Sequence, residues 1–129
     1  MGDLQKVMLV EDEADIREVA KIALEMVGGL EVEVCSSGEE ALHKAPAFAP
    51  DLILLDVMMP GIDGPTTLQR LRERPGLEST PVVFMTAKVM QAELDEYRSL
   101  GAADVIPKPF DPMTLADRLK DVWGGQHGG

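Results

Sequence analysis

Short apolar runs recur at intervals along this chain. Residues 7–10, 52–55 and 82–85 each contain four apolar residues in succession. Runs of this length, bounded by loops or by a proline, are typical of strands that are buried on both faces of a sheet. Residues 31–35 instead alternate charged and apolar side chains, which predicts an edge strand, and residues 104–106 predict one further short strand.

Helical periodicity occupies the segments between these strands. Apolar residues recur at helical spacing after the first run, at Ile16, Val19, Ala20, Ala23 and Val27, and Gly28–Gly29 ends that pattern. A second helix is predicted to begin at residues 36–40 and end near Pro46, and a third to cover residues 66–74. A fourth is predicted from the apolar stripe Met90, Leu94 and Tyr97. The last is predicted to begin at Asp111–Pro112, with its inward-facing side chains at Leu115, Leu119, Val122 and Trp123. Strand and helix alternate five times, which predicts an α/β fold with a parallel sheet and helices on both faces.

Length and charge limit the choice of class. The chain has 129 residues and a formal net charge of −11, and nothing in it repeats. We expect one domain at residues 1–123 and a flexible glycine-rich tail at residues 124–129. The acidic balance argues against a nucleic-acid partner and favours a monomer or weak dimer. One cysteine, no signal peptide and no membrane-length apolar run favour a cytoplasmic protein.

The residues at the predicted strand ends carry the candidate chemistry. Glu11 and Asp12 follow the first strand, Asp56 the third, Thr86 the fourth and Lys108 the fifth. The carboxyl ends of parallel strands share one edge of the sheet, where ligands bind in open α/β folds. Clustered carboxylates repel one another, and a hard divalent cation with oxygen ligands relieves that repulsion. The neighbouring Glu13 and Asp15 are interpreted only as the acidic start of a helix.

These motifs resemble the receiver domain of the two-component response-regulator family. The resemblance covers residues 6–123 and is that of a stand-alone, chemotaxis-regulator-like receiver without an output domain. It is carried by Glu11–Asp12, by Asp56 with Met59–Pro60–Gly61 and Asp63–Gly64, by Thr86–Ala87, and by Lys108–Pro109–Phe110. It implies a flavodoxin-like, doubly wound sheet of five parallel strands in the order 2-1-3-4-5.

The resemblance also implies a role for each residue. Asp56 would accept a phosphoryl group from the phosphohistidine of a sensor histidine kinase or histidine phosphotransfer protein. Mg²⁺ would be held by Asp12, Asp56 and the Met58 carbonyl, and by Glu11 through water. Thr86, Ala87 and Lys108 would contact the phosphoryl group, and the Lys108–Pro109 bond would be cis. Such a protein catalyses only its own phosphorylation and dephosphorylation.

Two departures from the family pattern concern switching. Val105 stands where many receivers carry a Tyr or Phe that moves on activation, and Pro107 lacks a backbone donor. We therefore expect Thr86 and the loop after it to transmit activation to a face at residues 90–123. A downstream protein target would bind this face. Met58 and Lys88, each two residues beyond a site residue, are expected to set the lifetime of the phosphorylated state.

Other functions are weighed against this one. An aspartate-nucleophile phosphatase would require a second Asp at the position of Met58, and a flavin carrier would require a phosphate loop where the acidic residues 11–13 stand. The remaining alternative is a protein-binding module of the same fold that works without phosphorylation. The sequence identifies neither the kinase nor the pathway.

Overall fold

The sheet is parallel throughout and has the expected order. The computed structural model describes residues 3–87 and 90–126. Its strands are β1 (Lys6–Val10), β2 (Glu31–Cys35), β3 (Leu52–Asp56), β4 (Val82–Thr86) and β5 (Asp104–Pro107). They lie side by side as β2-β1-β3-β4-β5, which confirms both the 2-1-3-4-5 order and the outer position of β2.

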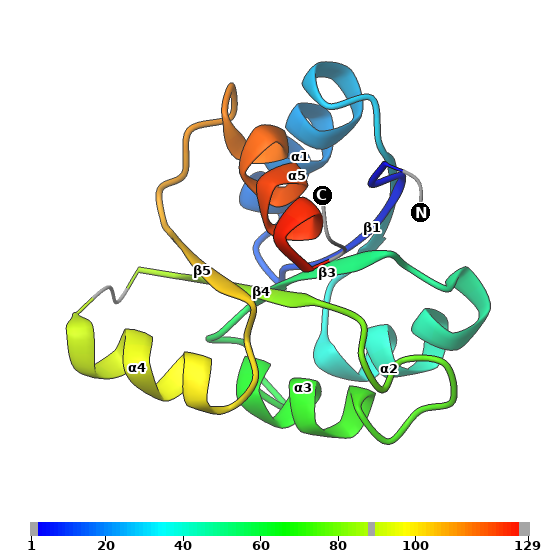
Figure 1. Cartoon of the computed structure of the whole chain (residues 1–129), viewed down its shortest axis with the longest axis vertical. Coiled ribbons are helices and arrows are strands. Elements are labelled where there is room, and N and C mark those ends of the chain that lie inside the picture. The colour runs from blue at the N-terminus through cyan, green and yellow to red at the C-terminus, as the bar shows by residue number, and fades with distance from the viewer. Residues whose placement is uncertain (1–2, 88–89, 127–129) are drawn as a thin grey trace.

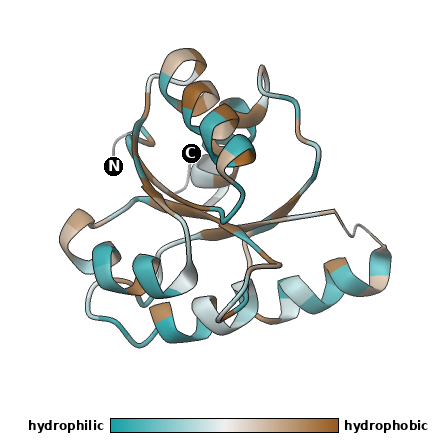
Figure 2. Cartoon of the chain, turned by 180° about the vertical axis from the view of Figure 1, so that it is seen from behind, coloured by the Kyte–Doolittle hydropathy of each residue, from teal (hydrophilic) through white to brown (hydrophobic). Residues whose placement is uncertain are grey.

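Helices cover both faces of the sheet. On one face lie α1 (Ala14–Ile22), which continues as a π-helical turn η1 (Ala23–Val27), and α5 (Leu115–Gln126). On the other lie α2 (Gly38–Phe48), α3 (Gly64–Leu71) and α4 (Gln91–Ser99) (Figure 1). Figure 2 shows largely apolar strands between helices that mix polar and apolar residues.

Strand residues alternate between two separate cores. Leu54 and Met85 pack with α1 and α5, whereas Leu55 and Phe84 pack with α2, α3 and α4. Because successive side chains of a strand point to opposite faces, a continuous apolar run supplies both cores at once. The central strands β3 and β4 are buried along their whole length.

Helix boundaries differ from those expected. Helix α5 begins at Leu115 rather than Asp111, because Asp111 caps the preceding turn by accepting from the Met113 amide at 2.9 Å. It continues through Gly124 and Gly125 to Gln126, so the expected end at Trp123 is wrong; residues 127–129 lie outside the described residues. Packing of Trp123 against the α1-side core stabilises a turn that glycine disfavours.

Helix α2 ends at Phe48, near Pro46 as expected, and Pro46 itself lies inside the last turn, where the loss of one donor does not terminate the helix. Two further expectations about helices are wrong. Helix α3 starts at Gly64 because Asp63 accepts from the Thr66 amide at 2.9 Å. Met90 precedes α4 and is 71% exposed rather than inward-facing.

Candidate functional site

Backbone hydrogen bonds fix the strand ends that carry the site. The Glu11 amide donates to the Cys35 carbonyl at 3.0 Å, which extends the β1–β2 ladder by one residue. On the other side of the sheet, the Lys108 amide donates to the Thr86 carbonyl at 2.9 Å. The candidate side chains therefore leave the sheet from backbone that is held in register.

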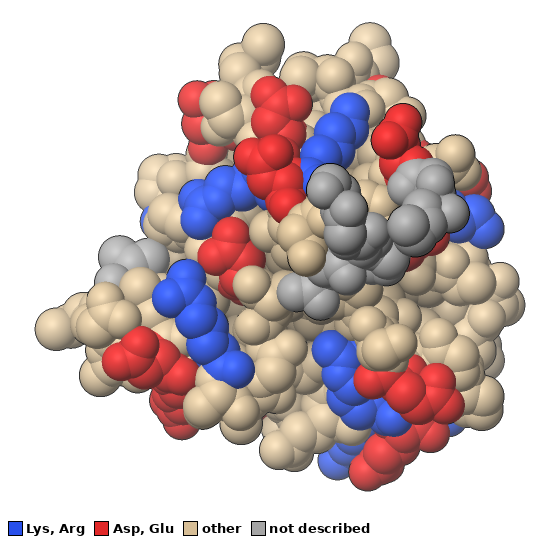
Figure 3. Space-filling view, in the orientation of Figure 1, with Lys and Arg blue, Asp and Glu red and all other residues tan. Residues whose placement is uncertain are grey.

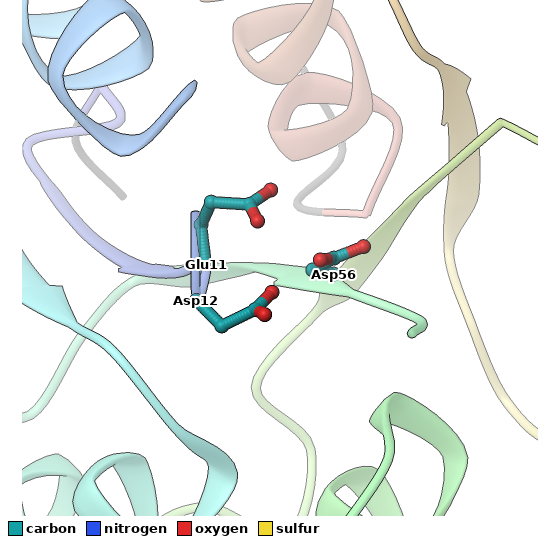
Figure 4. A group of neighbouring side chains, drawn as sticks. All are labelled: Glu11, Asp12 and Asp56. Atoms are coloured by element: carbon teal, nitrogen blue, oxygen red, sulfur yellow. The ribbon is translucent and has the colours of Figure 1, made fainter. Parts of the chain in front are cut away.

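Glu11, Asp12 and Asp56 form a compact group of carboxylates. One oxygen from each lies within 4.8 Å of the other two, and Figure 4 shows the three side chains directed into the same space. Glu11 and Asp56 are buried, and Asp12 is partly exposed. The convergence expected at this edge of the sheet is confirmed for these residues.

Lys108 reaches into the carboxylate group from the end of β5. Its Nζ lies 2.9 Å from Glu11 Oε1 and 3.1 Å from Asp56 Oδ1, and its side chain is only 13% exposed. The Lys108–Pro109 peptide bond is cis, as expected. One ammonium thus contacts two of the three carboxylates, so the group carries an excess of negative charge.

The proton affinities of these groups reflect burial and mutual contact. Burial raises the pKa of Glu11 to about 7, although its hydrogen bond to Lys108 opposes the rise. Burial also raises the pKa of Asp56, against the influence of Glu11 and Lys108. The pKa of Lys108 is lowered by burial but raised more by its contacts with Glu11 and Asp56, so that the net change is upward.

Two buried oxygens in this group, Asp12 Oδ1 and Asp56 Oδ2, accept no hydrogen bond from the described residues. Buried carboxylate oxygens without partners are costly, and Glu11 Oε1 has only its ion pair with Lys108. Mg²⁺ takes oxygen ligands, usually from one or two carboxylates while it retains several waters. The donor set and its uncompensated charge therefore fit Mg²⁺.

An open, largely apolar hollow surrounds Asp56. Thr86, Ala87 and Lys108 line it, as the sequence predicted, and so does Met58. The remaining lining residues are Glu13, Asp15, Ile16, Val19, Pro109 and Phe110. Glu13 and Asp15, which were interpreted only as a helix start, thus also place acidic groups at the hollow.

The loop after β3 is held close to the strand it leaves. A Cβ on Gly64 would lie 2.7 Å from the Asp56 carbonyl oxygen, so no larger residue fits there without displacing the loop. The Gly64 amide donates to the Val57 carbonyl at 2.8 Å, and the Met58 amide lies 3.4 Å from Asp56 Oδ1. Helix α3 therefore begins against the backbone of Asp56.

Tyr97 connects Thr86 with α4, a contact that sequence analysis missed. The Tyr97 hydroxyl is hydrogen-bonded to the Thr86 side chain, and burial raises the pKa of the phenol. Its ring meets Phe84 edge to face, with centroids 5.3 Å apart. Val105 is buried in the same core, and Lys88 lies outside the described residues. The apolar spacing along α4 predicted that Tyr97 packs inward, but it did not indicate which residue its hydroxyl contacts.

Arg17 is a second residue that sequence analysis missed. Its guanidinium donates to the backbone carbonyls of Glu11 and Asp12 from the middle of α1. Nothing in the apolar spacing of α1 marks this residue, because it falls among the polar positions of the helix.

Comparisons with known proteins agree on one family. The family model described as "Response regulator receiver domain" matches residues 7–120. The response regulator Rre1 of Synechocystis sp. is 36% identical over 98% of this chain and 54% of its own length. The phosphate regulon transcriptional regulatory protein PhoB of Rhizobium meliloti is 36% identical over 91% of this chain and 51% of its own length.

Solved structures resemble the fold over nearly its full extent. The chemotaxis protein CheY4 of Vibrio cholerae superposes with a TM-score of 0.86 at 33% identity, covering 92% of this chain and 98% of that one. This chain, by contrast, spans about half the length of the curated relatives above. Within the described residues, no helix has the length and apolar character needed to cross a membrane.

Proposed function

The chain belongs to the response regulator receiver family, and on that basis we propose that Asp56 accepts a phosphoryl group from the phosphohistidine of a sensor kinase or phosphotransfer protein. The observation that carries this proposal is the placement of Asp56. It is the buried carboxylate of the central strand β3, 3.1 Å from Lys108 and grouped with Glu11 and Asp12.

In the transfer, a carboxylate oxygen of Asp56 attacks phosphorus while the bond from phosphorus to the histidine nitrogen breaks, and the imidazole leaves with that electron pair. Glu11, Asp12, Asp56 and the Met58 carbonyl would hold Mg²⁺, which when bound neutralises charge on the phosphoryl oxygens. Lys108 supplies a second cation, and its two ion pairs restrict where its ammonium can lie.

Once formed, the acyl phosphate faces Thr86 and Ala87 across the hollow. A hydroxyl has one hydrogen to donate, so Thr86 would direct it to a phosphoryl oxygen, and Ala87 would contribute its backbone amide. The acyl phosphate carries about −1.5 to −2 charges where the Asp56 carboxylate carried one, and this change gives the rearrangement its driving force.

The phosphoryl donor would dock on the apolar rim of the hollow. Ile16 and Val19 of α1 and Phe110 lie beside Asp56, and the apolar surface continues along the helix to Ile22 and Met26, which are exposed. Val19→Asp should then slow transfer from a phosphohistidine protein, while phosphorylation by the small donor acetyl phosphate stays unchanged. Equal effects on both donors would exclude this docking surface.

The switch would run from Thr86 through Tyr97 to a partner-binding face at residues 90–123. If Thr86 turns its hydroxyl toward the phosphoryl group, its contact with the Tyr97 hydroxyl would change, and α4 carries Tyr97. Val105 is a stiff β-branched residue and would move little. Asp104 is held 3.5 Å from both Arg98 and Arg118, so the α4 and α5 sides of this face are tied to β5.

Further properties follow from the same proposal. A cytoplasmic location fits a protein that meets kinase domains. The target is expected to be a protein rather than nucleic acid, because Lys and Arg side chains lie among Asp and Glu on the face seen in Figure 3. A monomer or weak dimer remains the expectation, as does control of the phosphoryl lifetime by Met58 and Lys88.

Intact mass measurement after incubation with acetyl phosphate and Mg²⁺ tests the proposal. Wild-type protein should gain the mass of one phosphoryl group, and Asp56→Asn should gain none. A gain in the variant would place the acceptor elsewhere. No gain in folded wild-type protein would favour the alternative, a binding module of this fold that works without phosphorylation.

A further inference from the structure

Arg17 lies beneath the loop that carries two of the three clustered carboxylates. From α1 its Nη1 atom returns to the end of β1, 2.8 Å from the Glu11 carbonyl oxygen and 3.4 Å from that of Asp12. The side chain is half-buried, and the Arg17 amide also donates to the Glu13 carbonyl at 2.9 Å. The Arg17 guanidinium thus ties α1 to the backbone carbonyls of Glu11 and Asp12, which precede the helix.

The backbone of Glu11 and Asp12 has few other restraints. The Glu11 amide is tied to β2 through Cys35, and the Glu13 amide donates to Glu11 Oε2 at 3.1 Å. Asp12 Oδ1 is buried and accepts no hydrogen bond from the described residues, so the position of that carboxylate depends on its backbone. Repulsion from Glu11 and Asp56 would otherwise move the Asp12 loop outward.

We propose that Arg17 is a positioning residue for the divalent cation, and that it acts by holding the Glu11 and Asp12 carbonyls so that both carboxylates face Asp56. This inference rests on the proposed function, since it assigns Arg17 to the same metal site. Among the described residues, the Arg17 guanidinium donates to these two backbone oxygens and to none of the carboxylate oxygens that would bind the metal.

Arg17 could act on the site through its charge or by holding the loop. These two roles predict opposite effects of its removal on cation binding, so an experiment can separate them. If Arg17 mattered only as a positive charge near the site, its removal would strengthen the binding of a cation. If Arg17 holds the loop, its removal weakens binding even though a repulsive charge is lost. Lysine keeps the charge, but its shorter side chain lacks the planar guanidinium that places the single atom Nη1 against both carbonyls, so it should restore binding only in part.

The experiment compares Arg17→Gln, Arg17→Lys and Lys21→Gln with the wild type. Lys21→Gln is the matched control, because it removes one positive charge from the same helix at an exposed ion pair with Glu25. Mg²⁺ affinity is measured by calorimetry on unphosphorylated protein, and urea unfolding without metal is measured alongside. We expect affinity to fall on the order of tenfold in Arg17→Gln, as for other groups that orient metal ligands, and less in Arg17→Lys. Lys21→Gln should match the wild type.

The outcomes separate this inference from the proposed function. Equal or tighter Mg²⁺ binding by folded Arg17→Gln would overturn the positioning role. A loss of unfolding stability with unchanged affinity would show a structural role only, and would also overturn it. If Arg17→Gln does not fold, Arg17→Lys decides, and wild-type affinity in that variant would count against the inference. Failure of the wild type itself to bind Mg²⁺ would instead refute the metal site in the proposed function.

Discussion

Protonation of Glu11 should control the stability of the metal-free protein at neutral pH. Burial raises the pKa of this carboxyl from 4.5 to about 7. The folded protein therefore holds a proton that the unfolded chain releases. By linkage, the resulting stability is fully present below pH 4.5 and is lost as the pH rises through 7. This direction is opposite to that of a carboxylate stabilised by an ion pair, such as Glu40, whose pKa is lowered to about 2 by Lys44.

The size of this effect on the unfolding free energy follows from the shift in the pKa of Glu11. Between pH 5 and pH 8, the difference between the folded and unfolded pKa of Glu11 corresponds to roughly 2 to 3 kcal/mol of unfolding free energy. For a domain of this size, that is a shift of roughly 1 M in the urea midpoint. Burial raises the pKa of Asp56 as well, so Asp56 contributes to the pH dependence in the same direction.

Urea unfolding at pH 5 and pH 8, with a chelator present, measures this dependence. Wild-type protein should be more stable at pH 5, and Glu11→Gln should lose at least half of the difference. The other titrating groups are common to both proteins, so the comparison isolates the site. Saturating Mg²⁺ should restore stability at pH 8, because the cation binds the ionised carboxylates. A full pH dependence in Glu11→Gln would refute the assignment of the proton to Glu11.

Three substitutions extend these predictions. Asp12→Ala should weaken Mg²⁺ binding in calorimetry by on the order of tenfold or more, yet raise the urea midpoint of the metal-free protein because repulsion is relieved. Met58→Asn should shorten the life of the phosphorylated state, seen as faster loss of phosphoryl mass, because an amide can orient the attacking water; equal rates would contradict this. Tyr97→Phe should cost about 1 kcal/mol in urea unfolding and shrink the amide shifts that beryllofluoride induces in α4, while those around Asp56 persist; unchanged α4 shifts would exclude the Tyr97 route.

The sheet and the convergence of the site could be predicted because they depend on local patterns. The apolar runs before Glu11 and Asp56 are long enough to be buried strands, and parallel strands bring their carboxyl ends to one edge. The contacts of Lys108 with Glu11 and Asp56 then require only that its strand lie beside Thr86. The order of the strands came from family resemblance and not from periodicity.

The contacts that were missed depend on tertiary distances. Arg17 is one of several polar residues on α1, and only the fold brings its guanidinium to two carbonyls. Tyr97 was correctly placed inward, but the hydrogen bond of its hydroxyl depends on how closely α4 approaches Thr86. Helix ends such as that of α5 depend on packing of Trp123, which outweighs the low helix propensity of the glycines.

The charge of the site indicates where the proposed switch begins. Three carboxylates and one ammonium leave two negative charges, or one if a carboxyl keeps its proton. An incoming phosphoryl dianion would be repelled by that excess, so the proposed transfer should depend on a bound divalent cation. After transfer, Lys108 needs only to exchange its contact with Asp56 Oδ1 for a phosphoryl oxygen, while its 2.9 Å contact with Glu11 remains. The β5 side of the site therefore changes little. In the proposed switch, Thr86 would change its contact with Tyr97, so the larger rearrangement would start at the end of β4 and reach the surface through α4.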